Sequence, residues 1–460
     1  MVFRILLYKG RIKNAEIYIY NYSPIVFQNI MVSIKGKQLI KQRYTSYYYD
    51  ELKRLRDCQD PFELQQQRMK EFYKFIKKKS NFHSKRLMKF NNEVDVDNLE
   101  QYPLLEKEDI RNNIDEIITG NPNDLLKSGT GGSTGKSLKF YTSRYDMSRK
   151  IAYLDYFKEQ HGVHKGMKRA SIGGRKIIPN HQKKKIFWRY NEPLNQLLFS
   201  AYHADGENLK YYVNKLNDFK PETLDGFPTI LERLSKYILE HSIKLTFTPI
   251  AIFPTAEALT DEMKDNIEKA FGCPVRNQYA SSEGSPFITE NVEGQLEIGP
   301  MSGYFELQKI EDRIYELIVT GFYTTTTPLF RYKIGDSVEL YKDLPENYTQ
   351  KDIKIKRIIG RNNDFLKSNE RGIVTNAHLS TTLKVLGNSI IDAQFIQDKL
   401  NELNIKLVTE KDIDKNKIKN KLEKELISTF GKKTKFNYEF VDKIELTQGG
   451  KKRFTINNLK

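Results

Sequence analysis

Cysteine is scarce in this 460-residue sequence, which holds only Cys58 and Cys273. Two cysteines in so long a chain exclude a disulfide-rich secreted scaffold and favour a reducing cytoplasm. Long apolar runs are also missing. Residues 17–34 carry no charge, but polar residues and a proline interrupt them, so they are too polar for a membrane-spanning helix. Basic side chains stand near the start, where a signal peptide needs an apolar stretch. We therefore expect a soluble, cytoplasmic protein.

Acidic residues are fewer than basic ones, 59 against 76, which gives a formal net charge of +17. Residues 1–90 hold 20 basic and 7 acidic residues, so +13 of this excess lies in the first fifth of the chain. One hypothesis is peripheral contact between this region and the anionic inner face of a membrane. A solvated, lysine-rich surface explains the same count. No nucleic-acid partner is expected, because no zinc-finger or aromatic-basic module accompanies the charge.

The composition, 38% hydrophobic and 29% charged, is typical of a globular chain that needs no disulfide or metal for stability. Apolar residues at helical spacing predict helices over residues 45–90. From about residue 168, short apolar runs alternate with amphipathic segments, which predicts parallel strands joined by helices. The clearest βαβ unit has strands at 247–253 and 275–280, and a helix between Thr260 and Gly272.

The last hundred residues form a smaller unit in this interpretation. Ile418, Leu422, Leu426 and Phe430 lie four apart on one face of a predicted helix that Gly431 ends. We predict an α/β fold with a large, multi-layered N-terminal α/β domain and a small, mobile α+β C-terminal domain. The expected parts are a basic, largely helical N-terminal region packed on the large domain, the core of that domain, and a C-terminal lid: 1–90, 91–363 and 364–460.

The segment 128–137, SGTGGSTGKS, is the strongest local signal. Glycine backbone N–H groups can converge on an anion, hydroxyls add donors and a lysine adds positive charge. It is not a Walker loop, because Thr130 stands where the first glycine is required. The G-x-S-x-G pattern of a hydrolase is met at Ser133, although the stretch before it is a weak strand. A phosphate-binding loop of another kind is favoured, and a plain glycine turn stays open.

Several distant segments accompany this loop in a fixed order. They are YPLLEKEDIRNN (102–113), TGGSTGKSLKF (130–140), NQYASSEG (277–284), PLFRYKIGD (328–336), GRNND (360–364) and GGKKR (449–453). Together they resemble the adenylate-forming superfamily of acyl-CoA synthetases, luciferases and peptide-synthetase adenylation domains. Within it, the chain is most similar to the phenylacetate–CoA ligase-like family, particularly its capsular-polysaccharide-biosynthesis branch. The similarity covers roughly residues 30 to 457.

The resemblance implies a role for each matching residue. Those that would enclose the β- and γ-phosphates of ATP are Ser133, Thr134, Gly135 and Lys136. Those on the adenine side would be Ala256, Glu257, Tyr279 and Ser281. Ser282 and Glu283 would approach the phosphates and Mg²⁺, with Glu283 as the metal ligand. The ribose would contact Asp336 and Arg361, the hinge would be Asp364, and the catalytic lysine would be Lys451.

These residue types suit the implied chemistry. A carboxylate that attacks the α-phosphate of ATP meets a strongly anionic electrophile, so positive charge from Mg²⁺ and Lys451 is required. A carboxylate such as Asp336 suits ribose hydroxyls because it only accepts hydrogen bonds. Two departures from the family pattern, Ser137 for a frequent proline and Ala280 for a frequent glycine, are conservative. The stretch after residue 284 lacks the Cys and His of some relatives, so no structural zinc is expected.

The resemblance implies an ATP-dependent ligase that forms an acyl-adenylate and pyrophosphate from a carboxylic acid. It would then transfer the acyl group to CoA or to an amine acceptor, in capsular or surface polysaccharide biosynthesis. One alternative is a serine hydrolase that uses Ser133 with a downstream Asp and His378. The other is a non-catalytic scaffold with an adenylation-like fold.

Overall fold

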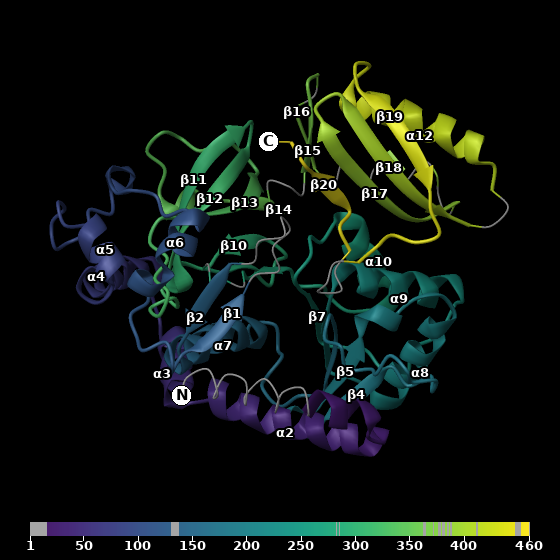
Figure 1. Ribbon diagram of the computed structural model, residues 1–460, viewed down its shortest axis with the longest axis horizontal. Helices are drawn as coiled ribbons and strands as arrows, with labels where there is room; N and C mark the ends of the chain where they lie inside the picture. The colour runs from purple at the N-terminus through teal and green to yellow at the C-terminus, as the bar shows by residue number, and fades with distance from the viewer. Residues whose placement is uncertain are drawn as a thin grey trace. The chain divides into compact units, whose positions relative to one another are not determined.

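The computed structural model (Figure 1) describes most of the chain, in two compact units. The residues described are 16–129, 138–281, 283–284, 286–361, 365–370, 372–375, 379, 382–383, 386, 389–410, 413–446 and 452–459. Unit 1 comprises 1–53, 151–257 and 263–276, and unit 2 comprises 54–150, 258–262 and 277–460. No described helix is long and apolar enough to cross a membrane.

Unit 1 is built on a five-stranded sheet of order β4-β5-β3-β6-β7. The strands are β3 (Arg169–Gly173), β4 (Trp188–Asn191), β5 (Gln196–Ser200), β6 (Thr223–Gly226) and β7 (Ala251–Pro254). The connecting helices are α8 (Leu209–Phe219), α9 (Pro228–Glu240) and α10 (Asp261–Phe271). The pairs β5–β3, β3–β6 and β6–β7 are parallel, and only the edge strand β4 is antiparallel. The predicted parallel α/β architecture is therefore confirmed in this unit.

The helix of the predicted βαβ unit is confirmed as α10, but both of its predicted strands differ in the structure. β7 begins at Ala251, because Pro249 lacks the N–H that a ladder needs. After α10, Val275 makes a single parallel bridge to Ile252. The next strand, β8 (Gln278–Tyr279), pairs antiparallel with β9 in a different sheet. The chain leaves the parallel sheet three residues after that bridge.

The first part of the chain is helical, as predicted for residues 45–90. The helices are α2 (Ile25–Arg43), α3 (Ser46–Arg56), α4 (Pro61–Lys79) and α5 (Asn81–Arg86). Asp60 caps α4, because its carboxylate accepts hydrogen bonds from the backbone N–H groups of Phe62 and Glu63. Helix α2 was not predicted, and its pattern of exposure is unusual.

Unit 2 contains a seven-stranded sheet of order β11-β12-β13-β14-β10-β9-β8. Its strands are β8, β9 (Ile288–Glu290), β10 (Leu296–Ile298), β11 (Gly303–Glu311), β12 (Ile314–Gly321), β13 (Tyr332–Leu340) and β14 (Ile355–Arg361). Every pair in it is antiparallel, so the expectation of parallel strands beyond residue 168 is wrong for residues 278–361. The sheet shares a hydrophobic core with α6 (Lys107–Ile117) and with the hairpin of β1 (Leu126–Gly129) and β2 (Lys139–Thr142).

The C-terminal residues of unit 2 have a separate core. A four-stranded sheet of order β19-β18-β17-β20 packs on α12 (Lys415–Phe430). Its strands are β17 (Ile390–Lys399), β18 (Glu402–Thr409), β19 (Lys435–Phe440) and β20 (Thr455–Asn457), and β15 (Phe365–Ser368) and β16 (Gly372–Thr375) form a hairpin. Ile418, Leu422, Leu426 and Phe430 are buried and Gly431 ends the helix at φ +88°, so the predicted helix is confirmed. The predicted fold class is confirmed as well.

His83 in α5 predicts a measurable acid sensitivity. Its ring is 1% exposed and its Nε2 lies 3.2 Å from the Pro328 carbonyl, while burial lowers the pKa of the ring to about 4. Between pH 6.5 and 4, His83 is therefore protonated in the unfolded chain and neutral in the folded chain. We expect this group to remove about 3 kcal/mol of unfolding free energy as the pH falls from 7 to 4.

Urea unfolding of the wild type and of His83→Gln, measured across that pH range, tests this expectation. Glutamine keeps a donor for the Pro328 carbonyl but cannot titrate, so the variant should lose this part of the pH dependence. His164→Gln, at an exposed histidine, is the control and should follow the wild type. Equal pH slopes for His83→Gln and the wild type would contradict the assignment.

Candidate functional site

Two residues from separate motifs meet in unit 2. The hydroxyl of Tyr279, at the end of β8, donates a 2.6 Å hydrogen bond to Oδ2 of Asp336 in β13. Three strands stand between β8 and β13 in the hydrogen-bonding order, so the sheet must curl for the two side chains to meet. Asp336 is 8% exposed, which makes it a largely buried carboxylate. Two predicted ligand-binding residues, 57 positions apart, thus lie in direct contact.

The backbone around Asp336 is tightly constrained. Gly335 precedes it with φ +80°, a conformation that residues with a Cβ rarely adopt. A Cβ at Gly335 would also lie 3.3 Å from Nζ of Lys107, at the start of α6. Across the ladder, Asp336 pairs with Arg361 of β14, the residue expected near the same ribose. The glycine therefore lets a cationic side chain approach the strand that carries the carboxylate.

The loop after β7 carries the predicted adenine-side residues of unit 1. Ala256 has φ +70°, a strained conformation for alanine that is often found at functional sites. Oε2 of Glu257 accepts hydrogen bonds from the backbone N–H (3.2 Å) and the hydroxyl (2.7 Å) of Thr229, in the first turn of α9. The negative charge of this carboxylate also interacts favourably with the positive, N-terminal end of the dipole of α9. Glu257 thus fixes the loop on α9 and holds Ala256 in its strained form.

Glu283 lies in the tight turn that follows β8. It is 8% exposed, and the next residue, Gly284, has φ +95°. The N–H of Gly284 donates to the hydroxyl of Ser281 at 3.1 Å, so this hydroxyl helps to close the turn. A Cβ at Gly284 would come 2.8 Å from Cγ2 of Thr324, too close for any other residue. The turn that carries Glu283 is therefore packed directly against Thr324.

Asp146, near the start of α7 (Arg144–Glu159), holds the segment that packs on this turn. The carboxylate is 1% exposed and accepts four hydrogen bonds, two each from Thr325 and Thr326. Each threonine contributes its backbone N–H and its hydroxyl, at 2.6–3.0 Å. Both carboxylate oxygens thus accept two hydrogen bonds each, and these bonds hold α7 to Thr325 and Thr326. Asp146 fixes the structure around Glu283 and leaves no acceptor for a ligand.

Lys150, one turn further along α7, was missed by the sequence analysis. Its Nζ lies 3.1 Å from the position that a Cβ on Gly284 would take. Burial lowers the pKa of this ammonium, and the carboxylates of Asp146 and Glu283 act in the opposite direction. A lysine in a helix that also carries other charged residues gives no sequence signal of such a position. The helix thus places a cation beside the carboxylate that was predicted to bind Mg²⁺.

The remaining predicted residues lie outside the described part of the chain. They are Ser133, Thr134, Gly135, Lys136, Ser282, Asp364 and Lys451, and His378 of the hydrolase alternative. Arg361 is described in its backbone alone. The strands that flank the glycine-rich segment are described: β1 and β2 pair antiparallel, with Gly129 opposite Lys139.

No group of three or more His, Cys, Asp or Glu that could hold a metal ion occurs among the described residues. Among the described residues, Glu283 is therefore not part of a cluster of three or more such ligands. Mg²⁺ is commonly held by one or two carboxylates together with the phosphate oxygens of a substrate. The carboxylate of Glu283, in a largely buried turn, is a suitable oxygen ligand for Mg²⁺ bound in this way.

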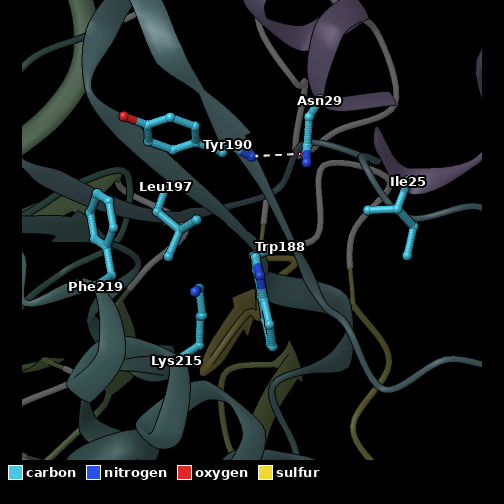
Figure 2. Close-up of a pocket in the computed structure, with 7 residues that line it drawn as sticks. All are labelled: Ile25, Asn29, Trp188, Tyr190, Leu197, Lys215 and Phe219. Carbon is cyan, nitrogen blue, oxygen red and sulfur yellow. Dashed lines mark hydrogen bonds between the residues drawn. The ribbon is translucent and has the colours of Figure 1, made fainter. Parts of the chain in front are cut away.

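Figure 2 shows the residues that line a cavity in unit 1, whose volume is about 310 Å³. Its lining comes from α2, β4, β5 and α8: Ile25, Asn29, Trp188, Tyr190, Leu197, Lys215 and Phe219. The walls are mainly aromatic and aliphatic, with the Lys215 ammonium 5.9 Å from the centre of the Trp188 ring. None of the residues in the predicted site lines it.

Comparison with solved structures gives the class of fold. A 2-hydroxyisobutyryl-CoA ligase in the postadenylation state, in complex with R3-HIB-AMP, matches with a TM-score of 0.65 and 15% identity over 85% of this chain and 88% of that one. The anthranilate CoA ligase AuaEII in complex with anthranoyl-AMP matches with a TM-score of 0.50 and 14% identity over 73% of this chain and 67% of that one. The fold is that of the adenylate-forming CoA ligases.

Comparison of sequences gives the family. A family model described as the CapK C-terminal domain matches residues 366–458. Protein CapK of Staphylococcus aureus is 65% identical over 446 residues, which cover 96% of this chain and 99% of that protein. The chain belongs to the CapK family.

The contacts of Asp146 predict a strong effect on stability. In Asp146→Asn, the amide nitrogen cannot accept, so at least two of the four hydrogen bonds with the threonines are lost. Buried hydrogen bonds to charged groups contribute about 1.5–3 kcal/mol each, so we expect the unfolding free energy to fall by about 3 kcal/mol. Chemical denaturation measures it, with Asp115→Asn, at an exposed position of α6, as the control. A loss below about 1 kcal/mol would contradict this role.

Proposed function

We propose that the protein is an ATP-dependent ligase that activates a carboxylic acid as an acyl-adenylate with release of pyrophosphate. The single observation that carries the proposal is the contact between Tyr279 and Asp336, at 2.6 Å. These residues come from two motifs expected to bind the adenine and the ribose of ATP, and they meet within the fold of the adenylate-forming CoA ligases. A serine hydrolase gives no reason for this contact.

In this proposal, Asp336 accepts hydrogen bonds from the ribose hydroxyls, which suits an ionised carboxylate. The hydrogen bond from Tyr279 orients Asp336 and places the tyrosine ring beside the adenine, with Ala256 and Glu257 on the adenine side. Glu283 would hold Mg²⁺, which neutralises phosphate charge when bound. Lys150 would supply a positive charge beside Glu283 in the absence of the metal. Ser133, Thr134, Gly135 and Lys136 would enclose the leaving phosphates, next to Ser282.

Two adjacent lysines compete for the catalytic role near the C-terminus. Lys452 makes an ion pair with Asp392 at 2.7 Å, and their side chains are 15% and 10% exposed. A lysine held in that way would lose a buried ion pair if it moved to a substrate. This contact supports Lys451 as the lysine that stabilises the transition state of adenylation. We also propose that residues 364–460 form a lid that moves about a hinge at Asp364.

The acyl acceptor is CoA or an amine. A 2-hydroxyisobutyryl-CoA ligase with a TM-score of 0.52 to this chain was solved with 2-HIB-AMP and CoA, which supports a thiol acceptor. The relationship to CapK supports a place in capsular polysaccharide biosynthesis, where an amine on a sugar would serve equally. We further propose cytoplasmic action with peripheral contact at the inner face of a membrane, through the basic N-terminal region.

Exchange of pyrophosphate into ATP, measured with a panel of carboxylic acids, tests the adenylation step. Lys451→Ala should lower the exchange rate roughly 100-fold or more, because one preorganised donor typically contributes that much. The matched control is Lys452→Ala, which removes the neighbouring charge and its ion pair and should keep most of the activity. Equal losses in the two variants would contradict the assignment of Lys451. No exchange with any acid in the wild type would favour the scaffold alternative.

The ribose contact is tested by ATP binding, measured by calorimetry. Asp336→Ala should weaken ATP binding roughly 100-fold or more, because two charge-assisted hydrogen bonds of at least about 1.5 kcal/mol each are lost. Tyr279→Phe keeps the ring and removes one hydrogen bond, so it should have a smaller effect. Asp312→Ala, at an exposed turn of the same sheet, should bind ATP as the wild type does. An unchanged affinity in Asp336→Ala would count against the ribose role.

A further inference from the structure

Helix α2 presents its large apolar side chains to solvent. Val26, Phe27, Ile30 and Ile34 are 68%, 58%, 49% and 53% exposed, and we call them the α2 apolar face. At 100° per residue, they fall within one quadrant or so of the helix surface. The helical turn before α2 continues the pattern, since Tyr22 is 66% exposed. A surface helix of a globular protein normally shows the reverse arrangement.

The inner side of α2 is polar and contacts the edge strand β4. Gln28 is 2% exposed, and its Oε1 accepts a 2.6 Å hydrogen bond from Nε of Arg189. Oδ1 of Asn29 accepts from the backbone N–H of Tyr190 at 3.0 Å, drawn as a dashed line in Figure 2. These contacts satisfy polar groups that an edge strand would otherwise leave open. Figure 1 shows α2, in purple, lying beside β4.

Two further features show how α2 is attached to the sheet. Gly36 is buried, and a Cβ there would lie 2.0 Å from Oδ1 of Asn191, so the helix approaches β4 through its backbone. Toward its N-terminus, Ile25 and Asn29 border the cavity of about 310 Å³, and Asn29 reaches β4 through its hydrogen bond with Tyr190. The exposed side chains of the α2 apolar face therefore take no part in its attachment, whereas Val32 packs inward on Leu198 and its neighbours. Contiguous exposed apolar surface of this kind marks a binding surface.

The charges around this face indicate its partner. Residues 1–43 hold 8 basic residues and a single acidic one, Glu16. Lys37 and Lys41 are exposed and continue the α2 apolar face by one and two helical turns beyond Ile34. Apolar side chains followed by lysines are typical of a helix that lies in the surface of an anionic membrane. A second copy of the chain would bring like charges together, which disfavours a dimer through this face.

We propose that α2 docks on an anionic lipid bilayer with its axis in the plane of the surface. Val26, Phe27, Ile30 and Ile34 would enter the boundary between headgroups and acyl chains, and Lys37 and Lys41 would contact lipid phosphates. The inner contacts with β4 would keep the rest of unit 1 outside the lipid. This inference deepens the proposed membrane contact but does not depend on ligase activity.

Flotation of the full chain with vesicles tests the proposal. The vesicles are pure phosphatidylcholine, or phosphatidylcholine with one third phosphatidylglycerol. The wild type should bind the anionic vesicles and bind the neutral ones at least roughly tenfold more weakly. Ile30→Asn/Ile34→Asn should lower binding to anionic vesicles more than roughly tenfold, because the insertion of two large apolar side chains is lost. Lys37→Gln/Lys41→Gln should lower it roughly 10- to 30-fold.

Matched variants distinguish this surface from general effects. Val292→Asn/Ile391→Asn removes two apolar side chains that are 54% and 60% exposed elsewhere, and it should bind as the wild type does. Lys417→Gln/Lys421→Gln removes two exposed lysines four apart on α12, and it should also keep full binding. Pyrophosphate exchange should be unchanged in all four double variants, which separates this test from the proposed function.

Three outcomes would overturn the proposal. One is equal binding of the wild type to neutral and anionic vesicles. Another is unchanged binding in Ile30→Asn/Ile34→Asn. The third is a wild-type dimer that does not bind vesicles and that this variant converts to a monomer, measured by light scattering. In that case a second copy of the chain covers the α2 apolar face.

Discussion

The geometry of the candidate site in unit 2 depends on one buried carboxylate. Asp146 accepts four hydrogen bonds from Thr325 and Thr326, and it joins α7 to a turn almost 180 residues further along the chain. A charge at 1% exposure would be costly without such partners, so the local structure forms only when all of them are in place. The same turn places Thr324 against Gly284, which leaves Glu283 a single position. A distant hydrogen-bond network thus sets the location of a residue expected to meet the phosphates.

Three carboxylates near this site differ in their surroundings, and the difference assigns different roles. Asp146 is saturated by backbone and hydroxyl donors, so it is structural. Asp336 meets the neutral hydroxyl of Tyr279, which orients the carboxylate without neutralising its charge. Glu283 lies beside Lys150, whose pKa is lowered by burial. Burial thus opposes the positive charge of the lysine beside Glu283, and the carboxylates of Asp146 and Glu283 favour that charge.

The sequence predicted the parallel sheet of unit 1 and helix α12, because apolar periodicity and a terminating glycine act locally. The contact between Tyr279 and Asp336 was implied only by motif order, since it requires a sheet that curls across three intervening strands. Lys150 could not be predicted at all. Its position depends on Gly284 and on the network of Asp146, and neither leaves a pattern around residue 150.

Helix α2 shows why average hydrophobicity is a poor guide to where a segment lies. The sequence predicts that residues 17–34 are too polar to span a membrane, because polar residues interrupt the apolar ones. It does not show which way each kind of side chain faces. In the structure, Asn29 accepts from a backbone N–H of the edge strand β4, and Gln28 accepts from the side chain of Arg189 in the same strand. With these polar residues turned inward, Val26, Phe27, Ile30 and Ile34 face outward, although Val32 packs inward on Leu198. Covering a sheet edge with polar side chains thus leaves an exposed apolar face, and such a face is typical of a binding surface.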